Sequence, residues 1–196
     1  TCAAVVRAAG EALVSDLGLR QVDLDVAIPS AGAAWSLANM ADMYAALGDR
    51  WPGCAEQLTP EMRFALEWAD STGYGMAERI RLEDRRTAIF EAMATVFDQV
   101  DLVITSSNPD VAFAADGPLP SVFGGIVDSA GNNGKLTIPS NLYGNPAISI
   151  PVGEVDGLPV GMQVLAPHHR DAWLLEAAWV VERERPWPLV ARAAKV

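Results

Sequence analysis

The sequence predicts an α/β fold, in which helices and strands of unequal length are mixed. Amphipathic helical periods dominate the first hundred residues, whereas most of the short apolar runs typical of strands appear after residue 101. In addition, 51% of the 196 residues are hydrophobic, and that much apolar surface offsets the entropy of ordering a chain. We therefore expect a single domain over residues 1–196, mainly helical over 1–100, with sheet strands, a cleft loop and a closing helix over 101–196.

Helical periodicity marks several stretches of the first half. Apolar residues recur every three or four positions over 3–17, and Gly18 follows where a helix ends. Similar spacing predicts a helix over 30–47, and Thr59-Pro60-Glu61 combines an N-cap oxygen, a first-turn proline and an early acidic residue. The longest helix is expected over about 76–97, with a buried side formed by Ile80, Ile89, Met93 and Val96.

Alternating or continuous apolar runs predict the strands. Val22, Leu24 and Val26 alternate with polar residues, which predicts a half-buried strand over 21–27. Leu102-Val103-Ile104 is a continuous run, as expected of a strand covered on both faces. Two further strands, at 147–152 and 158–166, are expected to pair as a hairpin.

A long segment of different character lies between these strands. Residues 107–136 are rich in glycine and proline and show little periodicity. Long loops of this kind usually carry function or are disordered. After the last strand, Asp171 begins an amphipathic helix that Pro186 ends.

The charge balance excludes several classes of partner. With 14 basic and 25 acidic residues the net charge is −11, which disfavours binding to nucleic acid phosphates and to anionic membrane surfaces. No apolar run approaches the ~20 residues of a membrane span. The sequence opens at Thr1 without a start methionine or a basic leader, so we expect no signal peptide and a missing upstream segment.

Neither the cysteines nor the histidines predict a metal site, and no motif predicts a cofactor. Cys2 and Cys54 lack zinc-binding spacing and are typical of reduced thiols in a cytoplasmic protein. His168 and His169 are adjacent, so their side chains point to different sides of a helix or strand and do not share a metal ion. No G-x-G-x-x-G follows a predicted strand, so dinucleotide binding has no support.

No serine is accompanied by the residues that would make it a nucleophile. Around Ser129 the nucleophile-elbow pattern lacks its first glycine, because Val127 stands there. Ser106 and Ser107 follow a predicted strand, where α/β folds place active sites, but a nucleophilic serine needs a base that nothing nearby supplies. The residues alone therefore predict no catalytic group in this chain.

One long stretch resembles the C-terminal hallmark of the amidase signature family. Residues 136–153, LTIPSNLYGNPAISIPVG, follow the pattern T-x-P-x-N-x-x-G-x-P-A-x-S-x-P-x-G, and residues 157–163, GLPVGMQ, follow the strand pattern G-L-P-x-G-x-Q. Residues 171–178 match the closing-helix pattern D-x-x-L-L-x-x-A. Residues 101–105 resemble a D-x-L-L-T strand, although Ser106 stands where a proline is usual. The resemblance is specific over about 101–183 and loose before it.

This resemblance implies part of a mixed β-sheet layered with helices, the C-terminal half of an enzyme that hydrolyses carboxylic amides. The family uses a serine nucleophile, a second serine in a cis peptide and a lysine base, all in its N-terminal half. No Gly/Ser-rich G-S-S-G-G-S segment occurs here, and the first lysine is Lys135. The resemblance therefore transfers no catalytic residue, and we expect this chain alone to be inactive.

What the chain is expected to supply is one wall of the substrate cleft. Phe123, Ile126, Asn132 and Tyr143 lie in the long loop and the hallmark, a charge-poor region, and an apolar wall with few polar groups suits a small-molecule amide. The other expected partner is the N-terminal half of the same enzyme. Because half of a sheet exposes a strand edge, the polypeptide is expected to pair with that half or with itself as a homodimer.

Two other functions stay open at this point. An A-type amidotransferase subunit that acts on aminoacyl-tRNA belongs to the same family, although the charge of −11 argues against an RNA contact on this part of the protein. A non-catalytic fragment that only binds or scaffolds is the alternative from a different class.

Overall fold

The structure is a computed structural model that describes residues 1–73, 75–116, 122–123, 126–127 and 135–188. By its internal contacts the chain divides into two compact units. The sheet unit comprises Thr1–Ile28 and Ala92–Val196, and the helical unit comprises Pro29–Glu91. The organisation as a single domain stays a prediction.

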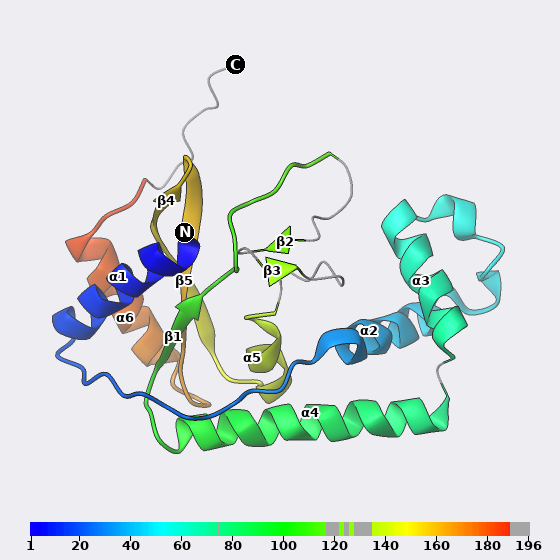
Figure 1. Cartoon of the computed structure of the whole chain (residues 1–196), viewed down its shortest axis with the longest axis horizontal. Helices are drawn as coiled ribbons and strands as arrows, with labels where there is room; N and C mark the ends of the chain where they lie inside the picture. The colour runs from blue at the N-terminus through cyan, green and yellow to red at the C-terminus, as the bar shows by residue number, and fades with distance from the viewer. Residues whose placement is uncertain (74, 117–121, 124–125, 128–134, 189–196) are drawn as a thin grey trace. The chain divides into compact units, whose positions relative to one another are not determined.

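An antiparallel sheet lies at the centre of the sheet unit (Figure 1). Its middle strand β5 (Leu158–Leu165) pairs on one side with β1 (Val103–Ser106) and on the other with β4 (Ala147–Val155). β4 and β5 form the predicted hairpin. Its two-residue turn, Asp156-Gly157, has φ angles of 53° and 77°, which tight hairpin turns require. The α/β class predicted from the sequence is confirmed.

Two helices cover one face of this sheet. α1 (Cys2–Asp16) contacts all three strands, and α6 (Asp171–Glu184) contacts β4 and α1. Between the helices and the sheet lies a core in which each large apolar side chain contributes about 1.5–3 kcal/mol by leaving water. Its buried members are Cys2, Val6, Leu13, Ile150, Val160, Met162, Val164, Ala166, Leu174, Ala177 and Val181.

The end of α1 follows the sequence closely. Gly18 adopts a left-handed φ of 62°, and its N–H donates to the carbonyl of Ser15 at 3.2 Å. The N–H of Leu19 reaches back to the carbonyl of Val14 at 2.9 Å. This pair of bonds is the Schellman motif, which satisfies carbonyls that the helix itself leaves free.

The opposite face of the sheet carries several polar side chains. Side chains alternate along a strand between its two faces. Ile104, Met162 and Ile150 belong to or pack against the core under the helices, so the residues next to them face away from it. Those neighbours include Thr105, Gln163 and Ser149, which stand side by side in the register of the three strands. Figure 1 shows the short helix α5 (Ile138–Tyr143) on this side, away from α1 and α6.

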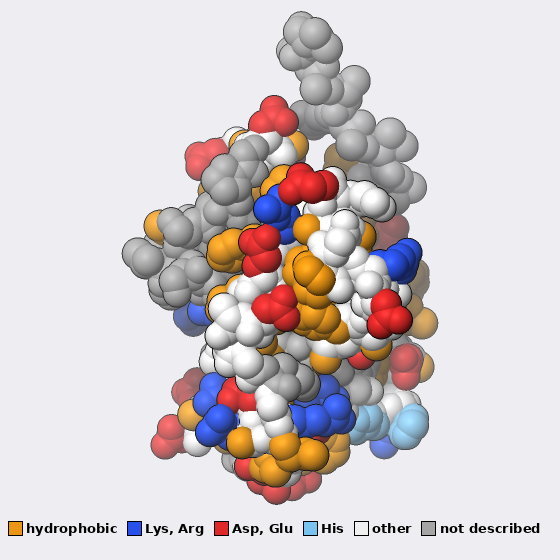
Figure 2. All heavy atoms as spheres, turned by 90° about the vertical axis from the view of Figure 1, so that its right-hand side faces the viewer, with side chains coloured by type: hydrophobic (Ala, Val, Ile, Leu, Met, Phe, Trp, Pro, Cys, Tyr) orange, Lys and Arg blue, Asp and Glu red, His pale blue; other side chains and the backbone are white. Residues whose placement is uncertain are grey.

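The helical unit has its own small core. It contains α2 (Gly32–Leu47), the 3-10 turns η1 (Gly48–Arg50) and η2 (Ala55–Gln57), α3 (Pro60–Thr72) and most of α4 (Met76–Phe97). Leu37, Ala69 and Leu82, one from each long helix, are buried against one another. Figure 2 shows one face of the molecule, on which hydrophobic side chains lie exposed between charged ones. None of the described helices is long and apolar enough to span a membrane.

The start of α3 and the extent of α4 confirm the predictions from sequence, with one exception. The Thr59 hydroxyl accepts a hydrogen bond from the N–H of Met62 at 3.4 Å, with Pro60 in the first turn. α4 has the predicted bounds, and Ile89, Met93 and Val96 are buried. Ile80, however, is 55% exposed, and Leu82 is the buried residue of that turn. The buried side of α4 therefore shifts between its first and last turns.

The strand predicted over 21–27 is wrong. Residues 19–30 contain no helix or strand, and Val22, which we expected on the buried side, is 38% exposed. The alternation of apolar and polar residues is present, but no described strand pairs with this segment. A strand needs a neighbour for its backbone groups, so alternation without a partner leaves an extended connection. The helix expected from residue 30 begins at Gly32.

Candidate substrate-binding wall

The structure describes the four predicted wall residues to different extents. Phe123 in β2 (Val122–Phe123) and Ile126 in β3 (Ile126–Val127) are direct partners in a two-stranded antiparallel pair, so the backbone brings these two residues together. Their side chains lie outside the described part of the structure, as does all of Asn132. Tyr143 is described completely and ends α5.

Tyr143 belongs to a group of three rings. Its ring stacks on that of Phe97 with centroids 5.9 Å apart and planes 18° from parallel. On another side the ring of His168 lies 4.3 Å away, tilted by 49°. Aromatic pairs at such distances add about 0.5–1.5 kcal/mol beyond the area they bury. The phenol of Tyr143 is therefore held by rigid neighbours from the end of α4 and from the segment after β5.

His168 also bonds to the backbone of the residue whose ring it touches. Its Nε2 lies 2.9 Å from the carbonyl oxygen of Tyr143. A carbonyl can only accept, so Nε2 carries the proton and donates it. This bond caps the end of α5, where Gly144 takes the left-handed conformation with φ of 81°. Glycine permits this conformation because it has no Cβ.

The segment 136–146 is tied to the sheet by polar side chains. Asn145 is only 8% exposed; its Nδ2 donates to the carbonyls of Pro146 and Ala166, both at 3.0 Å. The hydroxyl of Ser140 donates to Oδ1 of Asn145 at 2.8 Å. From the middle strand, Nε2 of Gln163 donates to the carbonyl of Leu136 at 3.0 Å. Buried polar groups that are all bonded in this way fix the position of a segment.

Two expectations about this segment are corrected by these contacts. Proline fixes φ and lacks an N–H, so its position in the hallmark would predict an extended backbone at Pro139. Pro139 lies instead in the first turn of α5, where its missing N–H costs nothing. An asparagine in so irregular a stretch, Asn141, would be predicted to satisfy buried backbone groups. Asn141 is exposed and bonds within its own helix, to the carbonyl of Thr137 at 3.2 Å, whereas Asn145 satisfies the buried carbonyls.

Hydroxyl groups gather on the polar face of the sheet. The hydroxyl oxygens of Ser107 and Ser149 lie 2.5 Å apart, with Gly161 of the middle strand between them. A serine becomes nucleophilic when a base is in hydrogen-bond reach, and the partner that each hydroxyl has here is another hydroxyl. This pair is therefore suited to hold a position or contact a polar ligand group, and it does not constitute a nucleophile with its base.

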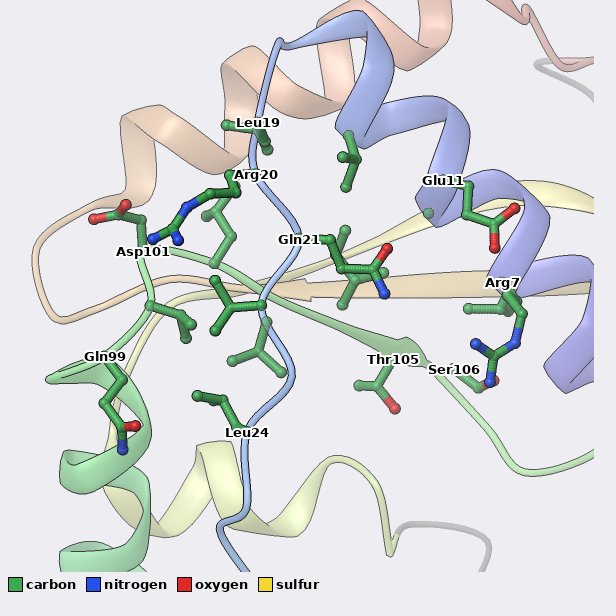
Figure 3. A pocket seen from close by; sticks show the side chains of 18 of the residues that line it. Arg7, Glu11, Leu19, Arg20, Gln21, Leu24, Gln99, Asp101, Thr105 and Ser106 are labelled. Carbon is green, nitrogen blue, oxygen red and sulfur yellow. The ribbon is translucent and has the colours of Figure 1, made fainter.

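A separate cavity of about 550 Å³ follows the edge of β1 that does not face β5 (Figure 3). Figure 3 shows the segment carrying Leu19 and Leu24 crossing in front of β1, with Arg7 and Glu11 of α1 on one side and Asp101 on the other. Its walls therefore mix both signs of charge with apolar groups. No cluster of potential metal ligands occurs among the described residues.

The elements define an α/β protein with an antiparallel sheet that carries a pair of serine hydroxyls, and with a separate group of three rings around Tyr143. A profile of the family described as Amidase matches residues 31–175. The chain belongs to the amidase signature family, as the resemblance of residues 101–183 indicated.

Curated relatives and solved structures agree with this assignment. The A-type subunit of glutamyl-tRNA(Gln) amidotransferase from Listeria monocytogenes is 36% identical over 117 residues, 60% of this chain and 23% of that protein. The corresponding protein of Salinispora tropica is 38% identical over 109 residues, 56% of this chain and 20% of that protein. This chain thus spans under a quarter of the length of these relatives.

The solved structures match nearly the whole chain. A bacterial aryl acylamidase of the amidase signature enzymes superimposes with a TM-score of 0.76 at 23% identity, over 93% of this chain and 40% of that one. The A-type subunit of glutamyl-tRNA(Gln) amidotransferase from Thermotoga maritima matches with a TM-score of 0.59 at 25% identity, over 93% and 39%. These likenesses confirm the fold.

Sequence reasoning missed the residues that hold the wall in place. Asn145 lay inside the hallmark but was not singled out, and its position next to Pro146 was the available signal. Gln163 is a polar residue in an otherwise apolar strand, a pattern that indicates a buried hydrogen bond. Phe97 and His168 are distant from Tyr143 in sequence, so nothing in the sequence predicts their contact with it.

Proposed function

We propose that this chain is the C-terminal part of an amide hydrolase, in which it supplies sheet strands and one wall of the substrate cleft. The substrate is a carboxylic amide, and the products are the acid and ammonia or an amine. The observation that carries the proposal is the family match over residues 31–175, together with a structural likeness that extends over 93% of the chain.

In the proposed reaction a serine outside these 196 residues attacks the amide carbonyl. A base takes the proton of the serine hydroxyl as the acyl–oxygen bond forms, and the protonated base gives that proton to the leaving amine as the carbon–nitrogen bond breaks. Water then attacks the acyl-serine, the acid departs, and the serine recovers its proton. Backbone N–H groups stabilise the negative oxygen that appears in both steps.

The residues of this chain take part by binding. Tyr143 is held between Phe97 and His168 and presents a rigid aromatic surface. Phe123 and Ile126, paired through their backbones, are proposed to extend the wall, and Asn132 to add a polar group. Rigid aromatic groups bind a substrate at little cost in conformational entropy, and the few polar groups orient it.

The N-terminal part of the same protein is the proposed partner for β1. Within the described strands β1 pairs only with β5, and the 550 Å³ cavity follows its other side. An edge with free N–H and C=O groups is a site for a further strand. The length of the matched structures supports this proposal, because this chain covers 40% of the aryl acylamidase.

A second candidate is an A-type amidotransferase subunit that acts on aminoacyl-tRNA. The curated relatives named above, at 36% and 38% identity, favour it. The net charge of −11 disfavours an RNA contact on this part of the molecule, so a partner protein would have to bind the RNA.

Both candidates are tested with the product of the complete reading frame that contains these residues. Release of ammonia or amine from a panel of aryl and alkyl amides, with covalent labelling of one serine by a fluorophosphonate, supports the hydrolase. The amidotransferase is supported if glutamine is the only amide in the panel that releases ammonia, and if it does so only when aminoacyl-tRNA and partner proteins are added. Amide hydrolysis by the 196-residue polypeptide on its own, or no turnover and no labelling of the complete product, contradicts the proposed function.

A further inference from the structure

The outer face of α6 carries two large apolar side chains in water. The inner face of this helix is buried through Leu174, Ala177 and Val181. On the other side Leu175 is 65% exposed and Trp179 is 57% exposed. Arg185, just after the helix, pairs with Asp16 at the end of α1, which fixes the orientation of the helix on the sheet.

These two side chains belong to a regular row along α6. Asp171, Leu175, Trp179 and Arg183 follow one another at intervals of four residues, and all four are exposed. Residues four apart form a continuous ridge on a helix surface. The ridge therefore has an acidic residue at its first end, an apolar centre and a basic residue at its last end.

This ridge is complementary to itself when two copies meet antiparallel. A two-fold axis that passes between Leu175 and Trp179 places Leu175 of one copy against Trp179 of the other. The same axis places Asp171 of each copy against Arg183 of the other. An isologous interface must match its own surface in this manner.

We infer that the Asp171–Leu175–Trp179–Arg183 ridge of α6 is the contact surface of a homodimer, with a second copy of this chain as its partner. Packing of four-residue ridges from two helices, at about −50° between the axes, is the commonest arrangement of helix pairs. The two apolar pairs form the centre of the contact, and the two ion pairs fix its antiparallel direction.

The neighbours of the ridge are compatible with this contact. The guanidinium of Arg183 lies 4.8 Å from the centre of the Trp179 ring and pairs with Glu184 at 2.7 Å. Arg170 lies 4.6 Å from the Trp173 ring. These contacts lie within one copy and hold the side chain of Arg183 at the end of the ridge.

The contact is modest in size. One helix face buries less than the roughly 800 Å² per partner of a standard interface, so the dimer is expected to dissociate on dilution. The inference does not depend on the proposed function, because association and amide hydrolysis are measured separately.

The test is sedimentation velocity of the complete reading-frame product over a range of concentrations. We expect a reversible monomer–dimer equilibrium, and Leu175→Glu or Trp179→Glu should raise the dissociation constant about tenfold or more, since each places a charge in the apolar centre twice per dimer. Ile80→Glu is the matched control, because Ile80 is similarly exposed but lies on α4.

A charge exchange between two variants gives the decisive measurement. Asp171→Lys alone sets two pairs of positive charges against each other, and Arg183→Glu alone sets two pairs of negative charges against each other, so each variant should be mainly monomeric. An equimolar mixture should form dimers again, because the lysine introduced by the first change then faces the glutamate introduced by the second. Any effect of the substitutions on the helix itself is the same in the mixture and cancels from the comparison.

Three results would overturn the inference. One is a monomer at every concentration. Another is a dimer that Leu175→Glu, Trp179→Glu and Ile80→Glu affect equally. The third is a mixture of the two charge variants that stays as monomeric as its components. Circular dichroism of each variant shows whether it is folded. If Leu175→Glu or Trp179→Glu does not fold, the mixture of Asp171→Lys and Arg183→Glu still tests the inference.

Discussion

The hydroxyl oxygens of Ser107 and Ser149 meet at 2.5 Å although they come from opposite sides of β5. Ser149 is part of β4, and Ser107 follows β1 and donates its N–H to the carbonyl of Gly161 at 2.9 Å. The hydroxyls can approach because Gly161 has no side chain on the polar face of the sheet. The absence of a Cβ at Gly161 thus allows a contact between residues from both strands that flank β5.

Replacing Gly161 by alanine should therefore destabilise the sheet unit. A Cβ at this position lies 2.8 Å from both hydroxyl oxygens and 3.2 Å from Cβ of Ser107. We expect a loss of about 1–3 kcal/mol in the free energy of unfolding, measured in urea, because the serines must separate. Gly75→Ala is the control, since nothing lies within 4 Å of a Cβ there. An equal effect of the two substitutions would contradict this account.

Asn145→Ala should be among the most damaging substitutions outside the apolar core. It removes an acceptor for Ser140 and both donors to the carbonyls of Pro146 and Ala166, in a position that is 8% exposed. Loss of about 2–4 kcal/mol in the free energy of unfolding is expected from unpaired buried groups. Ser140→Ala removes one of these bonds, so it should cost about 1 kcal/mol. Comparable effects of the two changes would show that the Asn145 amide is not the anchor.

The helical unit contains a tyrosine with a strong pH response. Burial of the Tyr44 hydroxyl, and then its interaction with Asp70, raise the pKa of Tyr44 to about 12. Its hydroxyl donates to the carbonyl of Leu66 at 3.0 Å. Folding favours the neutral phenol, so this stabilisation is complete below the ordinary value of about 10 and disappears as the pH rises through 12.

The ultraviolet absorbance of phenolate during an alkaline titration measures this shift. The difference between the native protein and Tyr44→Phe should show one tyrosine that ionises near pH 12. Asp70→Asn should lower that midpoint only in part, because burial is the larger cause. The pKa of Asp70 is held below its usual range by its interaction with Tyr44 and by the hydrogen bond that Nε1 of Trp51 donates to it at 2.9 Å, so its contribution is lost as the pH falls. A Tyr44 midpoint near the ordinary value of about 10 would show that the hydroxyl is solvated.

Tyr143 gives a test of the substrate wall. If the proposed function holds, Tyr143→Ala in the product of the complete reading frame should raise the Michaelis constant for amide substrates about tenfold and change kcat less, since the proposal gives the ring a binding role and no reacting atom. Tyr143→Phe keeps the stacking on Phe97 and the contact with His168, so it should raise the Michaelis constant less than Tyr143→Ala does. Unchanged kinetics of Tyr143→Ala across several amides would remove Tyr143 from the site.

The sequence predicts the helices of this protein better than its polar interactions. α4 has the predicted bounds because its periodicity extends along the whole helix, whereas Leu82 is buried in the turn where Ile80 was expected to be. The segment 21–27 has the pattern of a strand without a strand beside it. Periodicity describes one segment, but pairing depends on what lies next to it.

In the candidate site, too, local backbone shape could be predicted from the sequence and contacts between distant residues could not. The hallmark motif located the region of Tyr143, since proline and glycine at fixed spacing determine local backbone shape. The contacts of Tyr143 with Phe97 and His168, and the meeting of Ser107 with Ser149, join residues that are far apart in the chain. Such contacts come from the tertiary fold, so no local pattern indicates them.

Both ends of residues 108–135 are attached to the same strand. At one end the N–H of Ser107 bonds to Gly161, and at the other the side chain of Gln163 holds the carbonyl of Leu136. The free energy of closing a loop changes only slowly with its length. Changes in the length or sequence of residues 108–135 should therefore leave the register of β5 unchanged.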